Sequence, residues 1–243
     1  MTAVRSALYN AAFYAWTVVL CLLFVPLLVL PRPWMQVAAR QWQRGSLFLL
    51  RHLAGLDYEV RGRENLPDGA MVIAAKHQSA WDTMVFHLLV KDPTYILKRE
   101  LLRIPFVGWY LWRSGQIAID RSAGASALKA MTAKARAALA EGRQIIIFPE
   151  GTRTAPGTDR PYQPGVAMLY GLGAPVVPVA LNSGLFWGRN TFLKKPGVIT
   201  IEILPPMPEG LDRRAFVALL TERIETASRR LHAEAEARFS HLR

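Results

Sequence analysis

The sequence predicts an α/β fold: a layered, mostly parallel or mixed sheet flanked by helices, preceded by an N-terminal membrane-associated segment of two helices. Two observations predict it. Short apolar runs alternate with helical stretches from residue 58 onward, a pattern typical of layered α/β proteins. An apolar segment and then a basic amphipathic one occupy the first 56 residues. We therefore expect two regions, 1–56 as membrane anchor plus interfacial helix and 57–243 as one domain.

The apolar segment covers residues 8–31 and carries no charge. About 20 such residues are needed to cross a bilayer, so the segment predicts a retained anchor. A secretory signal peptide is the alternative, but Leu30-Pro31-Arg32-Pro33 is a poor cleavage site. Arginines follow the segment at positions 32, 40, 44 and 51. By the positive-inside rule they predict an inner-membrane protein whose remaining chain faces the cytoplasm.

The next stretch, residues 34–56, places apolar or small residues three to four positions apart and arginines elsewhere on the helical wheel. This spacing predicts an amphipathic helix. A basic amphipathic helix with tryptophan near its start suits a membrane interface. The alternative is a helix that packs on the domain.

Composition narrows the class of partner. The 243 residues include 30 Lys and Arg against 18 Asp and Glu, a formal net charge of +12, which indicates an anionic partner. We expect anionic lipid rather than nucleic acid, because the N-terminus is apolar and no zinc-finger or RNA-binding signature is present. The sequence has one cysteine and therefore no intrachain disulfide. Without a Walker loop, dinucleotide fingerprint or metal-ligand cluster, we expect no metal or redox cofactor.

Beyond residue 57 the elements alternate. Apolar runs predict strands at 58–60, 71–75, 94–97, 116–119, 144–148, 176–181 and 198–204. Helices are expected at about 80–90, 105–113, 123–140, 165–172 and 212–240. The Ala-rich helix 123–140 ends at Gly142 and is interpreted as structural.

His77 and Asp82 follow the buried strand 71–75, at the kind of sheet edge where open α/β sheets place their chemistry. Histidine titrates nearest neutral pH, and an aspartate can orient it as a general base. On a regular helix five residues turn through about 500°, so the two would meet only if a helix began between them. We expect Ser79 as N-cap and Asp82 as the third helical residue. The alternative is that Asp82 only accepts hydrogen bonds from amides at the helix start.

Cations follow three other predicted strands: Lys98 after 94–97, Arg121 after 116–119 and Arg153 after 144–148. Arginine presents a planar fork of donors that matches phosphate oxygens, and lysine a point charge. Each cation alone is typical of a solvated surface, but their convergence at one sheet edge would form an anion site.

Several stretches resemble the glycerolipid acyltransferase family, in particular the 1-acylglycerol-3-phosphate acyltransferases. They are His77-Gln78-Ser79-x-x-Asp82, residues 115–121 (Gly-Gln-Ile-Ala-Ile-Asp-Arg), 148–154 (Phe-Pro-Glu-Gly-Thr-Arg-Thr) and 174–180 (Ala-Pro-Val-Val-Pro-Val-Ala). The stretches 97–101 and 104–109 are also similar to the family. All occur in the family's order between residues 76 and 180.

The resemblance implies acyl transfer from a thioester, acyl-CoA or acyl-carrier protein, to the sn-2 hydroxyl of 1-acylglycerol-3-phosphate, giving phosphatidic acid. It implies His77 and Asp82 as the catalytic pair and assigns Glu150, Gly151, Thr152 and Arg153 to the acceptor site. Arg153 and Lys98 are the first choices for the phosphate, and Arg121 the next. Relatives can also carry two N-terminal helices that dip into one leaflet, which Pro26 would permit here.

Four questions stay open from the sequence. The acceptor could be glycerol-3-phosphate, another lysophospholipid or a lyso-aminolipid. A non-catalytic lipid-binding protein would need the cations but not His77. Lys76 stands where relatives often have Asn, and such a cation could act on His77 or help to hold an anionic substrate. Glu150 beside an anion site would instead pair a cation or receive a glycerol hydroxyl.

Overall fold

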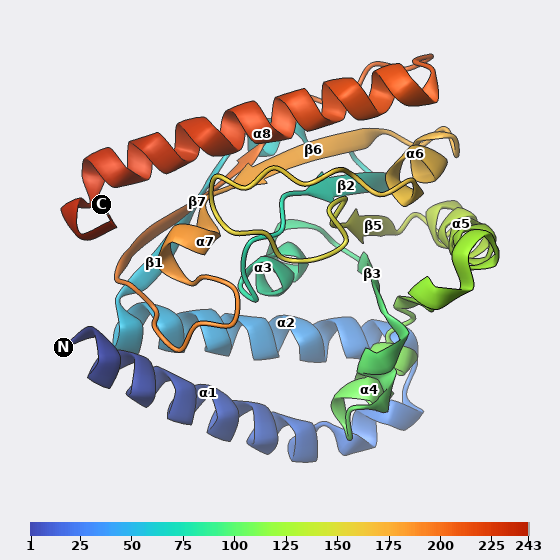
Figure 1. The fold of residues 1–243 in the computed structure, drawn as a ribbon. Helices are drawn as coiled ribbons and strands as arrows, with labels where there is room; N and C mark the ends of the chain where they lie inside the picture. The colour runs from blue at the N-terminus through green and yellow to red at the C-terminus, as the bar shows by residue number, and fades with distance from the viewer. Residues whose placement is uncertain (243) are drawn as a thin grey trace.

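A computed structural model describes residues 1–242, and its centre is a seven-stranded sheet in the order β1-β7-β6-β2-β5-β3-β4 (Figure 1). The strands are β1 Leu56–Arg61, β2 Met71–Ala75, β3 Pro93–Lys98, β4 Ile117–Ile119, β5 Gln144–Ile147, β6 Val176–Leu181 and β7 Gly197–Ile203. Every neighbouring pair is parallel except β6 and β7. The predicted α/β class with a mostly parallel, mixed sheet is confirmed.

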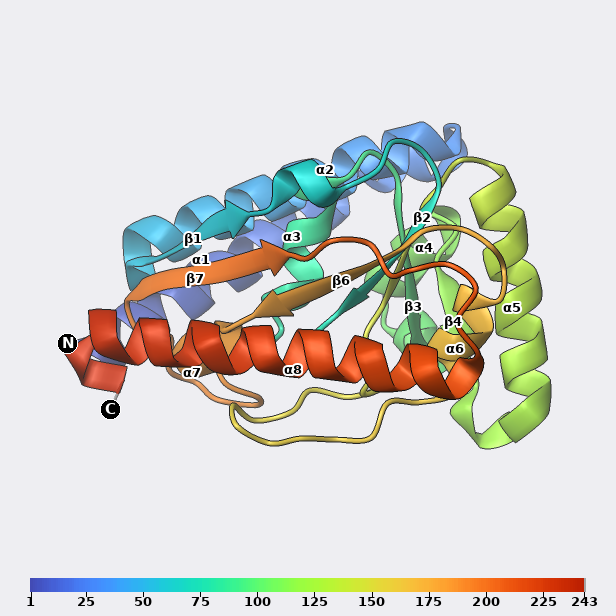
Figure 2. The same ribbon diagram turned by 90° about the horizontal axis from the view of Figure 1, so that it is seen from above.

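The two faces of the sheet are covered by different helices. The helices are α1 Thr2–Leu23, α2 Arg32–Leu49, α3 Asp82–Leu89, α4 Val107–Arg113, α5 Gly124–Ala140, α6 Gly165–Tyr170, α7 Ser183–Phe186 and α8 Arg213–Arg238. Ile73 and Ile146 are cross-strand partners that point into one core, with Trp81 and Phe86 around α3. Val72 and Ile145 point into the other, against α5, α6 and α8. Figure 2 shows α8 running across the sheet on the side away from α2.

All seven predicted strands are present. The central strands β2 and β6 are apolar throughout and fully buried, as expected where helices cover both faces of a sheet. The helices lie within a few residues of their predicted ranges. Helix α3 differs in one respect, since its N-cap is Trp81 rather than Ser79, and Asp82 is its first residue rather than its third. The Asp82 carboxylate accepts the amides of Gln78 and Ser79, and this holds residues 78–81 in a turn ahead of the helix. Helix α7 was not predicted.

The first two helices form an antiparallel hairpin. Trp16 donates to the carbonyl of Trp42, whose own indole donates to Thr17, while Arg5 donates to the carbonyl of Leu53. The apolar segment 8–31 is therefore not one helix: α1 begins earlier, at Thr2, and ends at Leu23. Pro26 follows in a 3₁₀ turn, Val25–Val29, because proline disfavours an α conformation at the residue before it.

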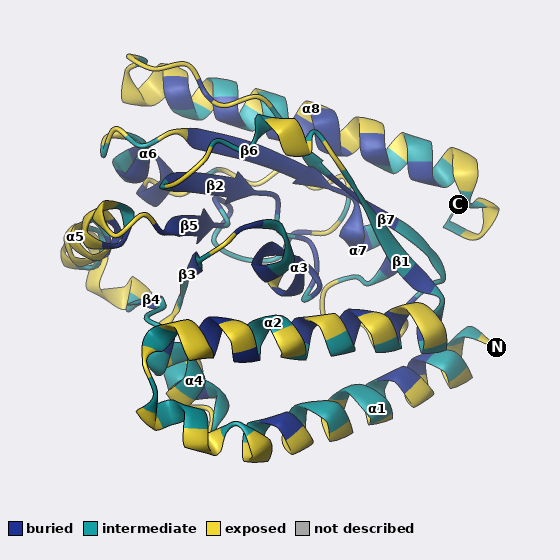
Figure 3. Cartoon of the chain, turned by 180° about the vertical axis from the view of Figure 1, so that it is seen from behind, coloured by how far each residue is buried: buried dark blue, intermediate teal, exposed yellow. Residues whose placement is uncertain are grey.

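Helix α1 has one outward face that nothing in residues 1–242 covers, as Figure 3 shows by its exposed and half-exposed turns. Exposed apolar side chains on it are Val4, Leu8, Tyr14, Val18, Val19, Leu22 and Leu23. In this part of the chain α1 alone is long and apolar enough to cross a membrane. Its packing on α2 also fits a helix that lies along a membrane surface.

The hairpin is fixed to the sheet by polar contacts. Arg32 forms a bidentate pair with Asp92, at 2.6 and 2.7 Å, and also donates to the carbonyl of Ser114. Arg40 donates to the carbonyls of His87 and Lys91. Bidentate, charge-assisted bonds of this kind set orientation as well as stability. The hairpin therefore has a defined position over α3 and β3.

The imidazole of His87 makes this docking sensitive to pH. Its Nδ1 lies 2.7 Å from Nε2 of Gln43 on α2. Burial, and then the charge of Arg40, lower the pKa of His87 to about 3. In the unfolded chain the same group titrates at about 6.5, so it binds a proton that the folded protein does not. The stability from this site is complete above pH 6.5 and is lost as the pH falls towards 3.

We therefore expect the free energy of unfolding of the wild type to fall more steeply below pH 6.5 than that of His87→Gln. The difference in slope should reach about 1.4 kcal/mol per pH unit. Denaturant unfolding of detergent-solubilised protein between pH 4.5 and 7.5 measures both slopes. The variant His52→Gln, at an exposed position, should follow the wild type. Equal slopes for wild type and His87→Gln would contradict the prediction.

Candidate active site

The parallel strands bring the predicted site residues to one edge of the sheet. β2, β5, β3 and β4 are consecutive parallel neighbours, so their carboxyl ends lie together. His77 follows β2, Lys98 ends β3, Arg121 follows β4, and the Gly151–Arg153 turn follows β5. All of them line one cavity. The cations therefore converge beside His77, as the sequence predicted.

His77 and Asp82 are in direct contact. Nδ1 of His77 lies 2.9 Å from Oδ2 of Asp82, which leaves Nε2 as the ring nitrogen available to a substrate. The His77 side chain keeps 14% of its exposure, whereas Asp82 has none. The imidazole also stacks on Phe148, with ring centroids 4.0 Å apart. The ring is therefore held by a hydrogen bond at one nitrogen and by an aromatic face.

The Asp82 carboxylate is fully saturated with donors. Besides the imidazole, Oδ2 accepts the backbone amides of Gln78 at 2.7 Å and Ser79 at 2.8 Å. Oδ1 accepts the hydroxyl of Ser183, the first residue of α7, at 2.5 Å. Both interpretations of Asp82 from the sequence therefore hold together: the carboxylate caps the turn and orients the imidazole.

The segment after β5 forms hydrogen bonds with the backbone of His77. The His77 amide donates to Oε1 of Glu150 at 3.2 Å, and the His77 carbonyl accepts the amide of Thr154 at 2.8 Å. The Thr154 hydroxyl adds a second bond to the same carbonyl, at 3.2 Å. Thus two stretches identified separately in the sequence, 76–82 and 148–154, form one unit.

Glu150 and Lys76 pair with each other beneath this unit, and Glu150 also lies at the wall of the anion site. Lys76 is 2% exposed and its Nζ contacts both oxygens of Glu225 on α8 at 2.7 Å. Glu150 is fully buried, 3.4 Å from the same Nζ. Burial raises the pKa of Glu150, and the Lys76 charge offsets only part of that effect. Of the alternatives for Glu150, the structure shows the one in which it pairs a cation. Lys76 does not help to hold a substrate anion.

The remaining cations surround the turn at Gly151, whose φ of +72° favours glycine. Arg121 donates to the carbonyl of Gly151. Arg153 lies 3.4 Å from Oδ1 of Asn190, and Arg189 donates to the carbonyl of Arg153 at 3.3 Å. These guanidinium groups thus bond to neutral oxygen atoms, and none of the three forms an ion pair within residues 1–242.

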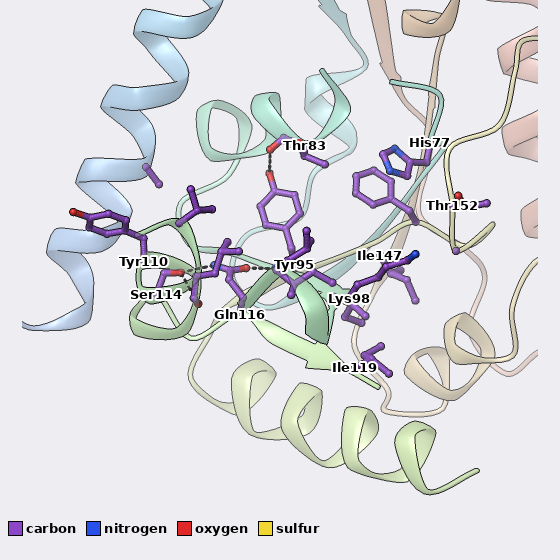
Figure 4. Close-up of a pocket in the computed structure, with 18 of the residues that line it drawn as sticks. His77, Thr83, Tyr95, Lys98, Tyr110, Ser114, Gln116, Ile119, Ile147 and Thr152 are labelled. Atoms are coloured by element: carbon purple, nitrogen blue, oxygen red, sulfur yellow. Dashed lines mark hydrogen bonds between the residues drawn. The ribbon is translucent and has the colours of Figure 1, made fainter. Parts of the chain in front are cut away.

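A cavity of about 880 Å³ extends from His77 into the molecule. Figure 4 shows His77 and Thr152 at one end, Tyr95 midway and Tyr110 beside the N-terminal helices at the other. Lys98, Arg121 and Arg153 line it near His77. Its deeper wall is mainly apolar and comes from α1, α2, α4 and α5, through residues such as Leu20, Phe24, Met35, Leu111 and Leu128. Its volume is in the range of ligand sites.

The sequence interpretation missed several residues of this site: Phe148, Arg160, Gln163, Ser183 and Arg189. Ser183 could have been found, because it lies just beyond β6, which is parallel to β2 and ends at the same edge. Arg189 could not, because its loop carries no motif. Within residues 1–242 no group of three or more His, Cys, Asp or Glu side chains is placed to hold a metal ion.

The comparisons with known proteins agree with this geometry. The profile of the family described as "Acyltransferase" matches residues 57–182. The 1-acyl-sn-glycerol-3-phosphate acyltransferase of Pseudomonas aeruginosa is 38% identical over 92% of this chain and 88% of its own length. The human 1-acyl-sn-glycerol-3-phosphate acyltransferase alpha is 30% identical over 84% of this chain and 73% of its own. The chain belongs to the acyltransferase family.

A solved acyltransferase has the same fold. The crystal structure of the 1-acyl-sn-glycerophosphate acyltransferase of Thermotoga maritima superimposes with a TM-score of 0.78, over 96% of this chain and 100% of that one, at 22% identity. The high coverage includes the N-terminal hairpin. Family membership makes this chain an enzyme and disfavours the non-catalytic lipid-binding protein that the sequence had left open.

Ser183 provides a test of how the acyltransferase holds its buried aspartate. Removing its hydroxyl in Ser183→Ala takes one donor from Asp82, and bonds to charged groups are worth about 1.5–3 kcal/mol. We expect kcat to fall roughly tenfold while KM for the acceptor changes little. Steady-state kinetics normalised to folded protein measure both constants.

The matched control is Ser228→Ala. Ser228 is equally buried, but its hydroxyl has no partner within the described chain, so its removal should leave kcat within about twofold. A loss of the same size in both variants would mean that Ser183 acts only through general stability.

Proposed function

We propose that this acyltransferase transfers a fatty acyl group from a thioester to the sn-2 hydroxyl of 1-acylglycerol-3-phosphate, giving phosphatidic acid for phospholipid synthesis. The observation that carries the proposal is the His77–Asp82 pair placed between a cation cluster and a long apolar cavity. A phosphate, a reactive hydroxyl and an acyl chain are the three parts of this substrate. The names of the relatives from Pseudomonas aeruginosa and human support the same acceptor.

In the proposed reaction, Nε2 of His77 removes the proton of the acceptor hydroxyl as its oxygen attacks the thioester carbonyl. The C–S bond then breaks, and the proton passes from His77 to the departing thiolate. General base catalysis of this kind contributes about 10²- to 10⁴-fold. Asp82, with Oδ2 on Nδ1, holds the ring in the tautomer that leaves Nε2 free and stabilises the imidazolium. No cofactor enters this scheme beyond the thioester co-substrate.

The basic residues orient the acceptor. Lys98, Arg121 and Arg153 converge on the Gly151-Thr152 turn beside His77, where they would hold the phosphate and fix the distance of the hydroxyl from the ring. Orientation of this kind converts an encounter into an effectively intramolecular step. The apolar cavity beyond Phe148 would take an acyl chain.

The enzyme would work at a membrane surface, where acceptor and product both reside. The exposed apolar face of α1 supports this placement, and the net charge of +12 would add attraction to anionic lipid. We assign it to the cytoplasmic face of the inner membrane on the arginines that follow the apolar segment.

Transfer of labelled acyl groups to lysophosphatidate, from acyl-CoA and from acyl-carrier protein in parallel, tests the function and identifies the donor. We expect phosphatidate from at least one donor and a loss of about 100-fold or more in His77→Ala. The variant His52→Ala, at an exposed position, should keep its activity. An unfolding curve for His77→Ala that matches the wild type excludes misfolding. Undiminished transfer by folded His77→Ala would refute the mechanism.

A further inference from the structure

A second, smaller pocket of about 390 Å³ adjoins the catalytic cavity. The two share the turn at Gly151 and Thr152 and the side chains of Lys98, Arg121 and Arg189. Arg160 and Gln163, from the loop after β5, complete the polar wall together with Glu150. Arg160 and Arg189 lie outside the stretches that resemble the family's motifs. Arg160 and Arg189 are therefore two cations of this site that the family's motifs do not predict.

The pocket carries an excess of positive charge. Four of its lining residues are cations: Lys98, Arg121, Arg160 and Arg189. Within residues 1–242, Lys98 and Arg160 have no ion pair or hydrogen-bond partner, and Arg121 and Arg189 donate to backbone carbonyls. Such an arrangement attracts an anion, because none of these four cations forms an ion pair with another described residue.

The acidic groups nearby do not balance this charge. Glu150 is the one lining carboxylate, and it is buried against Lys76 and the amide of His77. Asp159, next to Arg160, pairs with Arg229. Burial lowers the pKa of Arg121, and the charges of exposed Glu100 and of Arg160 then act on it in opposite directions. Arg160 and Arg121 line the same small pocket, so both can act on one ligand.

We propose that Arg160 and Arg189 extend the head-group site, so that the enzyme selects acceptors bearing a phosphate monoester over lysolipids whose phosphate is a diester. This inference rests on the proposed function. It identifies the charge of the phosphate as the feature of the acceptor that the site recognises. A monoester carries a charge of about −1.5 to −2 at pH 7 and has three terminal oxygens for Arg forks. A diester carries a single charge and fewer free oxygens.

In this proposal the enzyme distinguishes acceptors by the charge of the phosphate and not by the size of the head group. A pocket of about 390 Å³ has room for more than a phosphate group, so a diester head group is not kept out by size. Neutralising the two arginines should therefore weaken the monoester and leave the diester nearly unaffected. A site that excluded head groups by shape would respond differently, because charge removal would not alter the ranking of acceptors.

The test compares Arg160→Gln, Arg189→Gln and the double variant, as full-length enzyme in neutral detergent micelles. The acceptors are lysophosphatidate, lysophosphatidylglycerol and lysophosphatidylethanolamine, each at the same low mole fraction in the micelle so that they add little surface charge. We expect each single change to raise KM for lysophosphatidate roughly tenfold with kcat within about twofold. The efficiency on both diesters should stay within about twofold, so the preference for the monoester falls roughly tenfold per change. Arg136→Gln, an exposed arginine on α5, is the matched control and should change neither constant.

The outcomes separate this inference from the proposed function. An enzyme that acylates lysophosphatidate, but whose arginine variants lose equal efficiency on all three acceptors or on none, would overturn the inference alone. A wild type that prefers a diester acceptor would overturn the inference together with the proposed acceptor. A selective rise in KM for the monoester would establish the two arginines as specificity determinants.

Discussion

The buried carboxylate of Asp82 is the constraint on which the site depends. A charge without solvent exposure is costly unless donors surround it, and Asp82 has four: two backbone amides, one imidazole and one hydroxyl. Three of them belong to residues 77–79 and the fourth to α7. The hydrogen bonds to this carboxylate therefore fix the strand-to-helix turn and join it to a segment about 100 residues away. The orientation of His77 follows from this arrangement.

The topology of the sheet explains why cations accompany this turn. Parallel strands deliver their carboxyl ends to one edge, so residues after β2, β3, β4 and β5 meet. The one antiparallel pair adds a further segment. Because β7 runs against β6, the connection between them, with Arg189, begins and ends at that same edge. A reversal of one strand thus brings a loop without any motif to the anion site.

These two constraints also show what the sequence could and could not predict. Apolar runs identified all seven strands, and strand ends identified His77, Lys98, Arg121 and Arg153, because both depend on local pattern. The positions of Lys76 and Glu150 could not be predicted, because both depend on a distant contact. Lys76 pairs with Glu225 on α8, 149 residues along the chain, and Glu150 pairs with the same lysine. Ser183 is an intermediate case, since the strand-end rule applied to β6 would have identified it.

The N-terminal hairpin connects the chemistry to the substrate's environment. Helix α1 contributes Leu20 and Cys21 to the cavity that begins at His77, and Phe24 follows directly after it. Val18, Val19 and Leu22 of the same helix face outward. One helix therefore supplies both an inner wall for an apolar chain and an exposed apolar surface. Arg32 and Arg40 fix its partner α2 to the sheet, so this wall keeps its position relative to His77. An enzyme with a lipid acceptor would gain from this coupling, because the surface that would contact the bilayer and the cavity that would receive the acyl chain then belong to one rigid element.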